Sequence, residues 1–234
     1  MSNSYFQFKR FIVRQDKCAM KVGTDGVLLG AWAPIDNAEN VLDIGCGTGL
    51  ISLMLAQRSS AFITAIDIDT DAIEQCRENV IDSPWPDRID VHHTSLLYFQ
   101  PDYTFDVIVS NPPYFRNSLR SPVEKRSTAR HTDSLSYEDL LSNVKRLLSA
   151  RGLFSVIIPY DAVNEILFIA ENHGLFPVKR TDIRTTPLKD PKRVLVSFSF
   201  SRTETDYRDL VIELSRHVYS EEYISLTRDF YLHM

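Results

Sequence analysis

The sequence predicts an α/β fold, in which a seven-stranded, mostly parallel sheet carries helices on both faces. From residue 40 onward, short apolar runs alternate with amphipathic segments, and glycines, prolines and capping residues separate them. Strands that alternate with helices are joined by right-handed crossovers, which produce parallel pairing and cover both sheet faces. The last two apolar runs have no helix between them, which predicts an antiparallel pair at one edge.

The expected elements follow one another along the chain. Strands are expected at residues 40–44, 62–66, 89–92, 105–110, 153–158, 176–184 and 193–200, and helices at 50–58, 72–80, 135–148 and 162–172. Thr70 or Asp71 is the expected capping residue of the helix over 72–80, and Gly174 ends the helix over 162–172.

The first 33 residues depart from this pattern. Apolar Phe6, Phe8, Phe11 and Val13 alternate with polar residues, which predicts a hairpin. Residues 27–32 predict a short apolar helix with a capping residue before it and a proline after it. We expect a single domain over 1–234, with 1–33 as an N-terminal hairpin and helix extension and 34–234 as the catalytic core.

The whole-chain composition is that of an ordinary globular protein, 44% hydrophobic and 24% charged over 234 residues. No run of about 18 apolar residues and no signal-peptide core occur, so we expect a cytoplasmic protein with no membrane partner. Cys18, Cys46 and Cys76 form no Cys-x-x-Cys pair and no zinc-type cluster with histidine. We therefore expect no metal, and we expect no obligatory protein partner.

Basic residues are concentrated in three segments, although the net charge is −5. Residues 5–21 and 116–131 each hold five basic residues and one acidic residue, and residues 179–193 hold six and two, so each segment has a local charge of +4. Local patches decide whether a polyanion binds. One such segment indicates solvated surface, but three make nucleic-acid binding an equally good interpretation. The candidate contacts are Lys9, Arg10, Arg116, Arg120, Lys125, Arg126 and Arg130.

A glycine-rich turn, with Gly45, Gly47 and Gly49, follows the first predicted strand. Glycines allow a tight reversal and let a ligand approach the backbone. The Gly-x-Gly-x-Gly spacing differs from the Gly-x-Gly-x-x-Gly of dinucleotide sites, and no phosphate-binding Gly-Lys-Ser/Thr follows. Asp43 before the turn would repel a pyrophosphate but suits a cation, and Asp67 after the second strand suits two ribose hydroxyls. This combination predicts S-adenosylmethionine as the ligand.

A second motif, Asn111-Pro112-Pro113-Tyr114, follows the fourth predicted strand. Ligands of open α/β sheets bind beyond the carboxyl ends of the strands, so this motif points at the same crevice as the glycine turn. A proline turn alone would only end a strand. The polar residue before the prolines and the aromatic residue after them favour a functional interpretation.

The chemistry gives each of these residues a task. A planar amino nitrogen is a poor nucleophile, and two acceptors for its two N–H groups favour the pyramidal form that attacks a methyl group. The Asn111 side-chain oxygen and the Pro112 carbonyl can be these acceptors. The Tyr114 ring can stack on an extruded base, which is worth about 1–3 kcal/mol. No general base is required before methyl transfer.

Together these motifs resemble class I S-adenosylmethionine-dependent methyltransferases of the N-P-P-Y branch. Three flanking segments are similar to the bacterial tRNA1(Val) (adenine(37)-N6)-methyltransferase family, and they lie at residues 8–11, 21–32 and 222–232. The resemblance covers nearly the whole chain. It implies the Rossmann-like class I methyltransferase fold, S-adenosylmethionine as cofactor, tRNA as acceptor, and the adenosine next to the anticodon of one valine tRNA as target.

The resemblance also implies roles for individual residues. Asp43, Gly45 and Gly47 would line the methionine moiety, Asp67 would hold the ribose, and Ile68 would pack on the adenine ring. The target base would lie against residues 111–114. Many relatives carry an acidic residue after the third strand, where this chain has Thr94-Ser95-Leu96, and the Ser95 hydroxyl can still hydrogen-bond. The other expected cofactor contacts are Gly49, Leu96 and Asn111.

Two alternatives share part of this evidence. A protein glutamine presents the same planar nitrogen, so the second motif also suits glutamine-N5 methylation, although only about 40 residues precede the first strand, too few for the helical domain typical of such enzymes. A protein that binds RNA without catalysing a reaction would show cofactor affinity and no methyl transfer.

Overall fold

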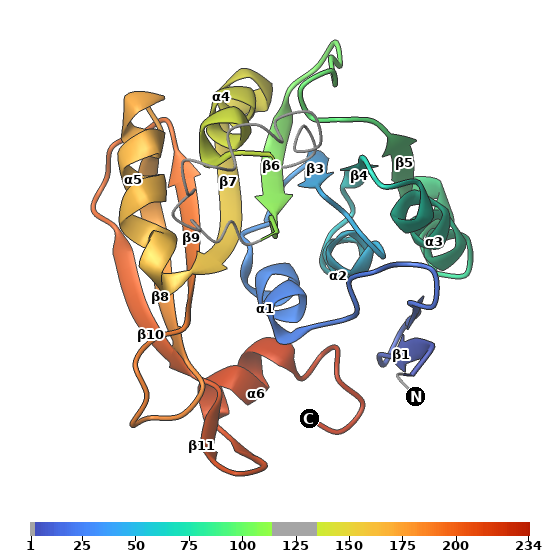
Figure 1. Ribbon diagram of the computed structural model, residues 1–234, viewed down its shortest axis with the longest axis vertical. Coiled ribbons are helices and arrows are strands. Elements are labelled where there is room, and N and C mark those ends of the chain that lie inside the picture. The colour runs from blue at the N-terminus through green and yellow to red at the C-terminus, as the bar shows by residue number, and fades with distance from the viewer. Residues whose placement is uncertain (1–2, 114–134) are drawn as a thin grey trace, which may run out of the picture.

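The computed structural model describes residues 3–113 and 135–234. A central eight-stranded sheet carries helices on both faces (Figure 1). Its strands are β3 (Asn40–Ile44), β4 (Phe62–Asp67), β5 (Ile89–His93), β6 (Phe105–Ser110), β7 (Leu148–Pro159), β8 (Phe176–Arg184), β9 (Arg193–Ser199) and β10 (Asp206–Val211). The α-helices are α1 (Thr24–Trp32), α2 (Leu50–Arg58), α3 (Thr70–Ile81), α4 (Tyr137–Leu147), α5 (Val163–Asn172) and α6 (Glu221–Thr227). Two hairpins lie outside the sheet, β1 (Tyr5–Gln7) with β2 (Ile12–Arg14), and β11 (Glu213–Ser215) with β12 (Val218–Tyr219).

The sheet order is β10-β8-β9-β7-β6-β3-β4-β5, and β9 alone of these strands runs antiparallel to its neighbours. This arrangement confirms the α/β prediction and the antiparallel pairing of β8 with β9, but the pair lies one strand in from the edge and not at it. The predicted strand count was wrong by one, because β10 adds parallel to β8. Only Leu210 of β10 is buried. Charged side chains on an edge strand protect it from pairing with other chains, and here they hid its apolar pattern.

Two helix starts differ from the prediction. The cap of α3 is Asp69, not Thr70 or Asp71: its Oδ1 accepts from the backbone N–H groups of Asp71 at 2.8 Å and Ala72 at 3.1 Å. Helix α1 begins three residues earlier than expected, and its N-cap, Gly23, makes no side-chain capping bond. The first turn of α1 therefore keeps backbone N–H groups that a ligand can use.

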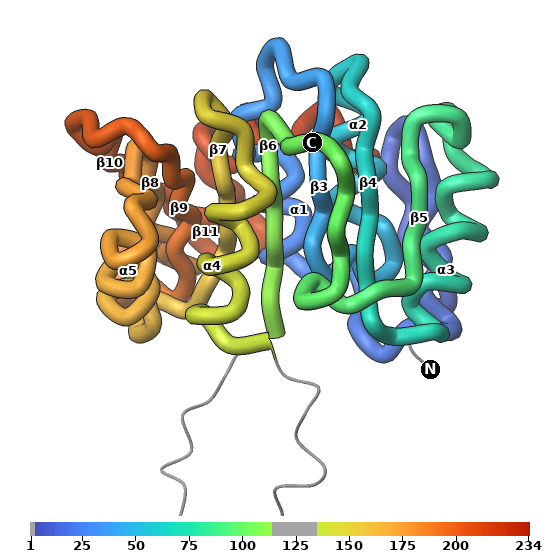
Figure 2. Tube along the Cα trace, turned by 90° about the horizontal axis from the view of Figure 1, so that it is seen from above, coloured from blue at the N-terminus to red at the C-terminus, as the bar shows by residue number. Residues whose placement is uncertain are grey.

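The two faces of the sheet pack separate cores. Buried side chains from the first hairpin and from α1, α2 and α3 form one core, whereas those from α4 and α5 form the other. Figure 2 shows α1 and α2 behind the sheet and α4 in front of it. Strand β3 serves both cores because its side chains alternate, with Val41 on the first face and Leu42 on the second. Asp43 consequently faces α2.

The predicted hairpin is present and packs against the end of the chain. Phe6 pairs with Val13 across β1 and β2, and the Phe8 ring stacks on the Tyr231 ring with centroids 5.8 Å apart. The backbone N–H of Lys9 donates to the Phe230 carbonyl at 2.8 Å. Residues on both sides of the predicted boundary at 33 thus share one core. Within the described residues, no helix combines the length and apolar character needed to cross a membrane.

Candidate active site

One cavity of about 430 Å³ brings the two sequence motifs together. The glycine turn contributes Gly45 to Thr48, and the end of β6 contributes Asn111 to Pro113. The sheet register causes this meeting: Ile44 at the end of β3 pairs with Ser110 at the end of β6, and the Ser110 hydroxyl donates to the Ile44 carbonyl at 3.0 Å. The chain therefore leaves two neighbouring strands at the same level and enters both motifs side by side.

The glycine turn shows why its glycines are needed. Gly45, Gly47 and Gly49 have φ of 72°, 55° and 81°, a region that side chains with a Cβ rarely adopt. A Cβ at Gly45 or Gly47 would meet nothing within 4 Å, so these two residues present bare backbone to the open cavity. A Cβ at Gly49 would lie 2.7 Å from the Cys76 sulfur. Gly49 is therefore required for packing α2 against α3, and it does not line the cavity.

Asp67 is held beside the turn by two backbone donors. The Gly47 N–H donates to its Oδ2 at 2.9 Å, and the Asp69 N–H donates to its Oδ1 at 3.0 Å. Both bonds fix the orientation of the carboxylate. The next side chain, Ile68, is 50% exposed. An oriented carboxylate next to an exposed apolar surface can bind a ribose and its base.

Asp43 lies beneath the cavity instead of lining it. Its side chain is completely buried, and its Oδ2 accepts from the backbone N–H of Ser52 at 3.1 Å and from the Ser52 hydroxyl at 2.7 Å. The other oxygen, Oδ1, has no hydrogen-bond partner within the described residues. Burial raises the pKa of this carboxyl to about 6. At neutral pH, Asp43 places a negative charge with an incomplete set of partners under the glycine turn.

A third wall of the cavity comes from residues that were not among the predicted site residues. Met20, Lys21 and Gly23 to Gly26 line it together with the glycine turn. The Lys21 ammonium donates to the Gln15 carbonyl, and the Arg193 guanidinium holds the Asp25 carboxylate at 2.9 Å. In the sequence, residues 23–26 served only as the start of a helix and as part of the flanking segment 21–32 that carries the family resemblance. Nothing in residue spacing alone places them against a turn about 20 residues further along the chain.

The remaining predicted cofactor contacts are less direct. The Ser95 hydroxyl accepts from the Leu97 N–H at 3.3 Å, which occupies part of its hydrogen-bonding capacity. The Leu96 side chain is 4% exposed and packs into the core under α4, so only its backbone could touch a ligand. Tyr114, Arg116, Arg120, Lys125, Arg126 and Arg130 lie outside the described residues.

Ion pairs within the fold neutralise much of the charge in the other two basic segments. In the first segment, Arg14 pairs with Asp82 at 2.9 Å, and Lys17 pairs with Glu74 and Glu78. In the third segment, the pairs within the described residues are Arg180–Asp182, Arg184–Asp209 and Arg193–Asp25. A count of basic residues along the chain therefore overstates the charge that these two segments offer to a polyanion.

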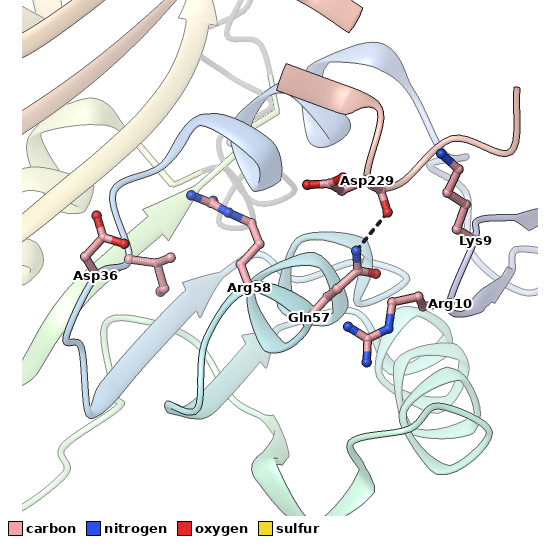
Figure 3. A pocket seen from close by; sticks show the side chains of 7 residues that line it. Lys9, Arg10, Asp36, Gln57, Arg58 and Asp229 are labelled. Carbon is pink, nitrogen blue, oxygen red and sulfur yellow. Dashed lines mark hydrogen bonds between the residues drawn. The ribbon is translucent and has the colours of Figure 1, made fainter. Parts of the chain in front are cut away.

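Lys9 and Arg10 line a second cavity, of about 530 Å³, at the other end of the sheet. Ile35 before β3 and Arg58 before β4 also line it, so it lies where these strands begin (Figure 3). The Lys9 ammonium donates to the carbonyls of Arg228 and Met234, whereas the Arg10 guanidinium lies over the Trp85 ring, 5.4 Å from its centroid. Lys9 thus has a structural role in anchoring the C-terminus.

No group of three or more His, Cys, Asp and Glu side chains in the described part of the chain could hold a metal ion. The three cysteines are buried and form no disulfide. The polar groups around the first cavity are instead backbone N–H groups and one ammonium, which donate, and the Asp43 and Asp67 carboxylates, which accept. This combination suits an organic ligand with both charged and nucleoside parts.

Comparisons with known proteins agree on one enzyme class. A family model described as the methyltransferase small domain matches residues 22–145. The chain is 57% identical to a tRNA1(Val) (adenine(37)-N6)-methyltransferase from Phocaeicola vulgatus, with the whole of both chains covered. It is 52% identical to the protein of that name from Bacteroides fragilis, again over both whole chains. The Flavobacterium psychrophilum protein of that name is 48% identical, covering 98% of this chain and all of its own.

Solved structures support the fold. A predicted O-methyltransferase from Agrobacterium tumefaciens superposes with a TM-score of 0.70 at 22% identity, covering 88% of this chain and 96% of its own. A glycopeptide N-methyltransferase solved with S-adenosyl-L-methionine has a TM-score of 0.56 at 14% identity, covering 78% and 90%. At these identities the likeness concerns the arrangement of strands and helices, which is that of class I methyltransferases.

Proposed function

This chain belongs to the tRNA1(Val) (adenine(37)-N6)-methyltransferase family, and from that premise we propose that it transfers a methyl group from S-adenosylmethionine to the N6 nitrogen of adenosine 37 in a valine tRNA. The observation that carries this proposal is the single cavity shared by the glycine turn and by Asn111–Pro113. Methyl transfer requires donor and acceptor in line and in contact, and two separate cavities could not provide this.

The residues around the cavity suit the donor. The bare backbone at Gly45 and Gly47 permits close approach, and the Asp67 carboxylate is oriented to accept from ribose hydroxyls. Lys21 and the uncapped first turn of α1 offer positive charge to the methionine carboxylate. Asp43, from beneath, offers negative charge to the cationic end of the donor. When bound, S-adenosylmethionine supplies an electrophilic methyl group on a positively charged sulfur.

The end of β6 suits the acceptor. We assign the Asn111 side-chain oxygen and the Pro112 carbonyl to the two N–H groups of the adenine amino group, which favours the nitrogen geometry that attacks. Ser110 positions both residues because its hydroxyl bonds β6 to the end of β3. Tyr114, outside the described residues, is proposed to stack on the base. These residues orient the acceptor and need not remove a proton before transfer.

We assign RNA binding mainly to the basic residues of the segment 116–131. Its Arg116, Arg120, Lys125, Arg126 and Arg130 follow the acceptor motif directly in the sequence. Arg10 can contribute a phosphate contact only if the RNA extends to the other end of the sheet, where the second cavity lies. The expected absence of a metal and the expected cytoplasmic location both stay predictions.

The test uses the purified chain, labelled S-adenosylmethionine and two valine tRNA transcripts that differ only at position 37, adenosine in one and guanosine in the other. Label should enter the adenosine transcript alone, and digestion should yield N6-methyladenosine. A glutamine-containing protein fraction serves as a third acceptor. Label in the protein fraction, or equal label in both transcripts, would contradict the proposed function.

A further inference from the structure

The buried Asn79 side chain connects the glycine turn, which lines the donor cavity, to the end of β2, which leads into another wall of that cavity. Asn79 lies on α3 and is 1% exposed. Its Oδ1 accepts from the Arg14 N–H at 2.8 Å, and its Nδ2 donates to the Arg14 carbonyl at 2.9 Å. The same Nδ2 donates to the Thr48 carbonyl at 2.9 Å. Arg14 ends β2, whereas Thr48 lies inside the glycine turn and lines the cavity.

The segment that leaves Arg14 is the third wall of the cavity. Residues 15–23, which we name the strap, contain no helix or strand and lead from β2 to α1. Met20, Lys21 and Gly23 of the strap line the cavity. An irregular segment of nine residues has no ladder of its own to define its position, so contacts with its neighbours must fix it. The Gln15 N–H donates to the Ser4 carbonyl at 2.8 Å, and buried side chains of α3 supply further bonds.

Two further amides hold the strap. Gln75, fully buried on the same helix, accepts from the Lys17 N–H at 2.9 Å through its Oε1. Gln15 closes the strap on itself: its Oε1 accepts from the Val22 N–H at 2.7 Å, and its backbone carbonyl accepts from the Lys21 ammonium. The position of Lys21 therefore depends on the point at which α3 holds the start of the strap.

We propose that Asn79 is a positioning residue for the methyl donor: it sets the separation of the strap and the glycine turn, and with it the fit of the methionine moiety between Lys21 and Gly47. A side-chain amide carries one acceptor and two donors, and here Arg14 and Thr48 use all three. No hydrophobic side chain of similar size reproduces this, because it leaves three backbone groups without partners. This inference rests on the donor site of the proposed function.

The test compares Asn79→Ala with Ile166→Ala. Ile166 is fully buried on α5, in the core on the opposite face of the sheet, so its truncation lowers stability without touching the cavity. The Kd for S-adenosylmethionine, measured by calorimetry at a temperature where both variants are folded, should rise at least about tenfold in Asn79→Ala, the equivalent of one buried hydrogen bond. It should stay within about twofold of the parent in Ile166→Ala.

Steady-state kinetics provide the second readout. In Asn79→Ala the KM for the donor should rise while kcat at saturating donor stays within about threefold, because the acceptor motif on β6 is untouched. Equal donor affinity in Asn79→Ala and Ile166→Ala, or a loss confined to kcat, would overturn the assignment. If Asn79→Ala does not fold, Asn79→Leu fills a similar volume while removing the three hydrogen bonds, and it should also raise the donor Kd. An unchanged Kd in Asn79→Leu would then overturn the inference.

Donor binding is measured without RNA. A protein that binds the donor normally but leaves valine tRNA unmethylated would contradict the proposed function and leave the role of Asn79 intact.

Discussion

The glycine turn and the strap, which both line the donor cavity, are built in different ways. The glycine turn takes its shape from backbone conformation within five consecutive residues, Gly45 to Gly49, three of which need positive φ. The strap takes its shape from side chains of α3 that lie 58 and 65 residues further along the chain. The first wall depends mainly on its own backbone conformation, with bonds to Asp67 and Asn79 added, and the second depends mainly on long-range contacts. Substitutions in the turn should therefore act through backbone strain, whereas the strap should tolerate a change of backbone residue at Gly23 and should lose its position when its anchors are removed.

The largest loss of activity is expected from a substitution in the acceptor motif, which belongs neither to the glycine turn nor to the strap. Asn111→Ala removes one of the two proposed acceptors and should lower kcat about 100- to 1000-fold, the usual cost of losing one preorganised polar contact to a reacting group. The Kd for S-adenosylmethionine should change less than about threefold, because the walls stay in place. Single-turnover assays and calorimetry on the same sample separate the two effects. A variant with near-normal turnover would refute the assigned role.

A matched pair of glycine substitutions tests the contrast between the walls. Gly47→Ala forces a Cβ into φ of 55° and should cost about 1–2 kcal/mol of unfolding free energy. It should also weaken donor binding by roughly tenfold or more, because the new methyl group projects into the cavity. Gly23→Ala in the strap has extended backbone and only an ordinary contact, 3.8 Å from the Lys21 carbonyl. Urea unfolding and donor titration should find it close to the parent; equal damage in both variants would show that the strap is as constrained as the turn.

The buried carboxyl under the turn predicts a dependence on pH. Because the folded-state pKa of Asp43 is raised from 3.8 to about 6, the folded protein binds the proton more tightly than the unfolded chain. The resulting stabilisation is complete below pH 3.8 and is lost as the pH rises through 6, a difference of up to about 3 kcal/mol. Asp43→Asn keeps the acceptor for Ser52 and should remove this loss, so it should unfold at higher urea concentration than the parent at pH 8.

The same substitution should weaken the binding of the cationic donor at pH 8, by about tenfold for a loss of roughly 1.4 kcal/mol. In the parent, donor affinity should fall as the pH drops below 6, and in Asp43→Asn this fall should be absent. A parent protein whose affinity is flat between pH 5 and pH 8 would show that the Asp43 charge does not reach the ligand.

The parts of the fold that were predicted correctly depend on local sequence patterns. Seven sheet strands were expected because apolar runs alternate with amphipathic helices, and both motifs lie at strand ends, where the topology brings them together. Strand β10 was missed because five of its six residues are not buried, and an edge strand needs only one apolar face. The cap of α3 was misplaced because Thr70, Asp71 and Asp69 are all good capping residues, and the choice among them depends on where β4 ends.

The site residues were predictable where they belong to short motifs, and not where their place depends on long-range contacts. Gly45, Gly47 and Asn111 line the cavity, because short motifs at strand ends place them there, and their roles as contacts of donor and acceptor stay predictions. Asp43 was expected at the wall and lies beneath it, since the alternation of β3 turns its side chain toward α2. The strap could not be predicted, because the amides of Gln75 and Asn79 look in the sequence like ordinary helix residues. Their role depends on which distant backbone they meet.

The smallest change in donor affinity is expected from loss of the exposed ion pair between Arg14 and Asp82. Asp82 lies three residues after Asn79 on the same chain and pairs with the Arg14 side chain at 2.9 Å, with both side chains more than half exposed. Exposed ion pairs contribute about 0–1 kcal/mol, because solvent screens them and both side chains lose freedom. Asp82→Asn should therefore change the donor Kd less than about twofold, at 50 mM and at 300 mM salt alike. Asn79 and Asp82 hold the same residue, Arg14, one through its backbone and the other through its side chain. A large loss in Asp82→Asn would mean that the strap is positioned by surface charge, and the buried amide would then be only one of several anchors.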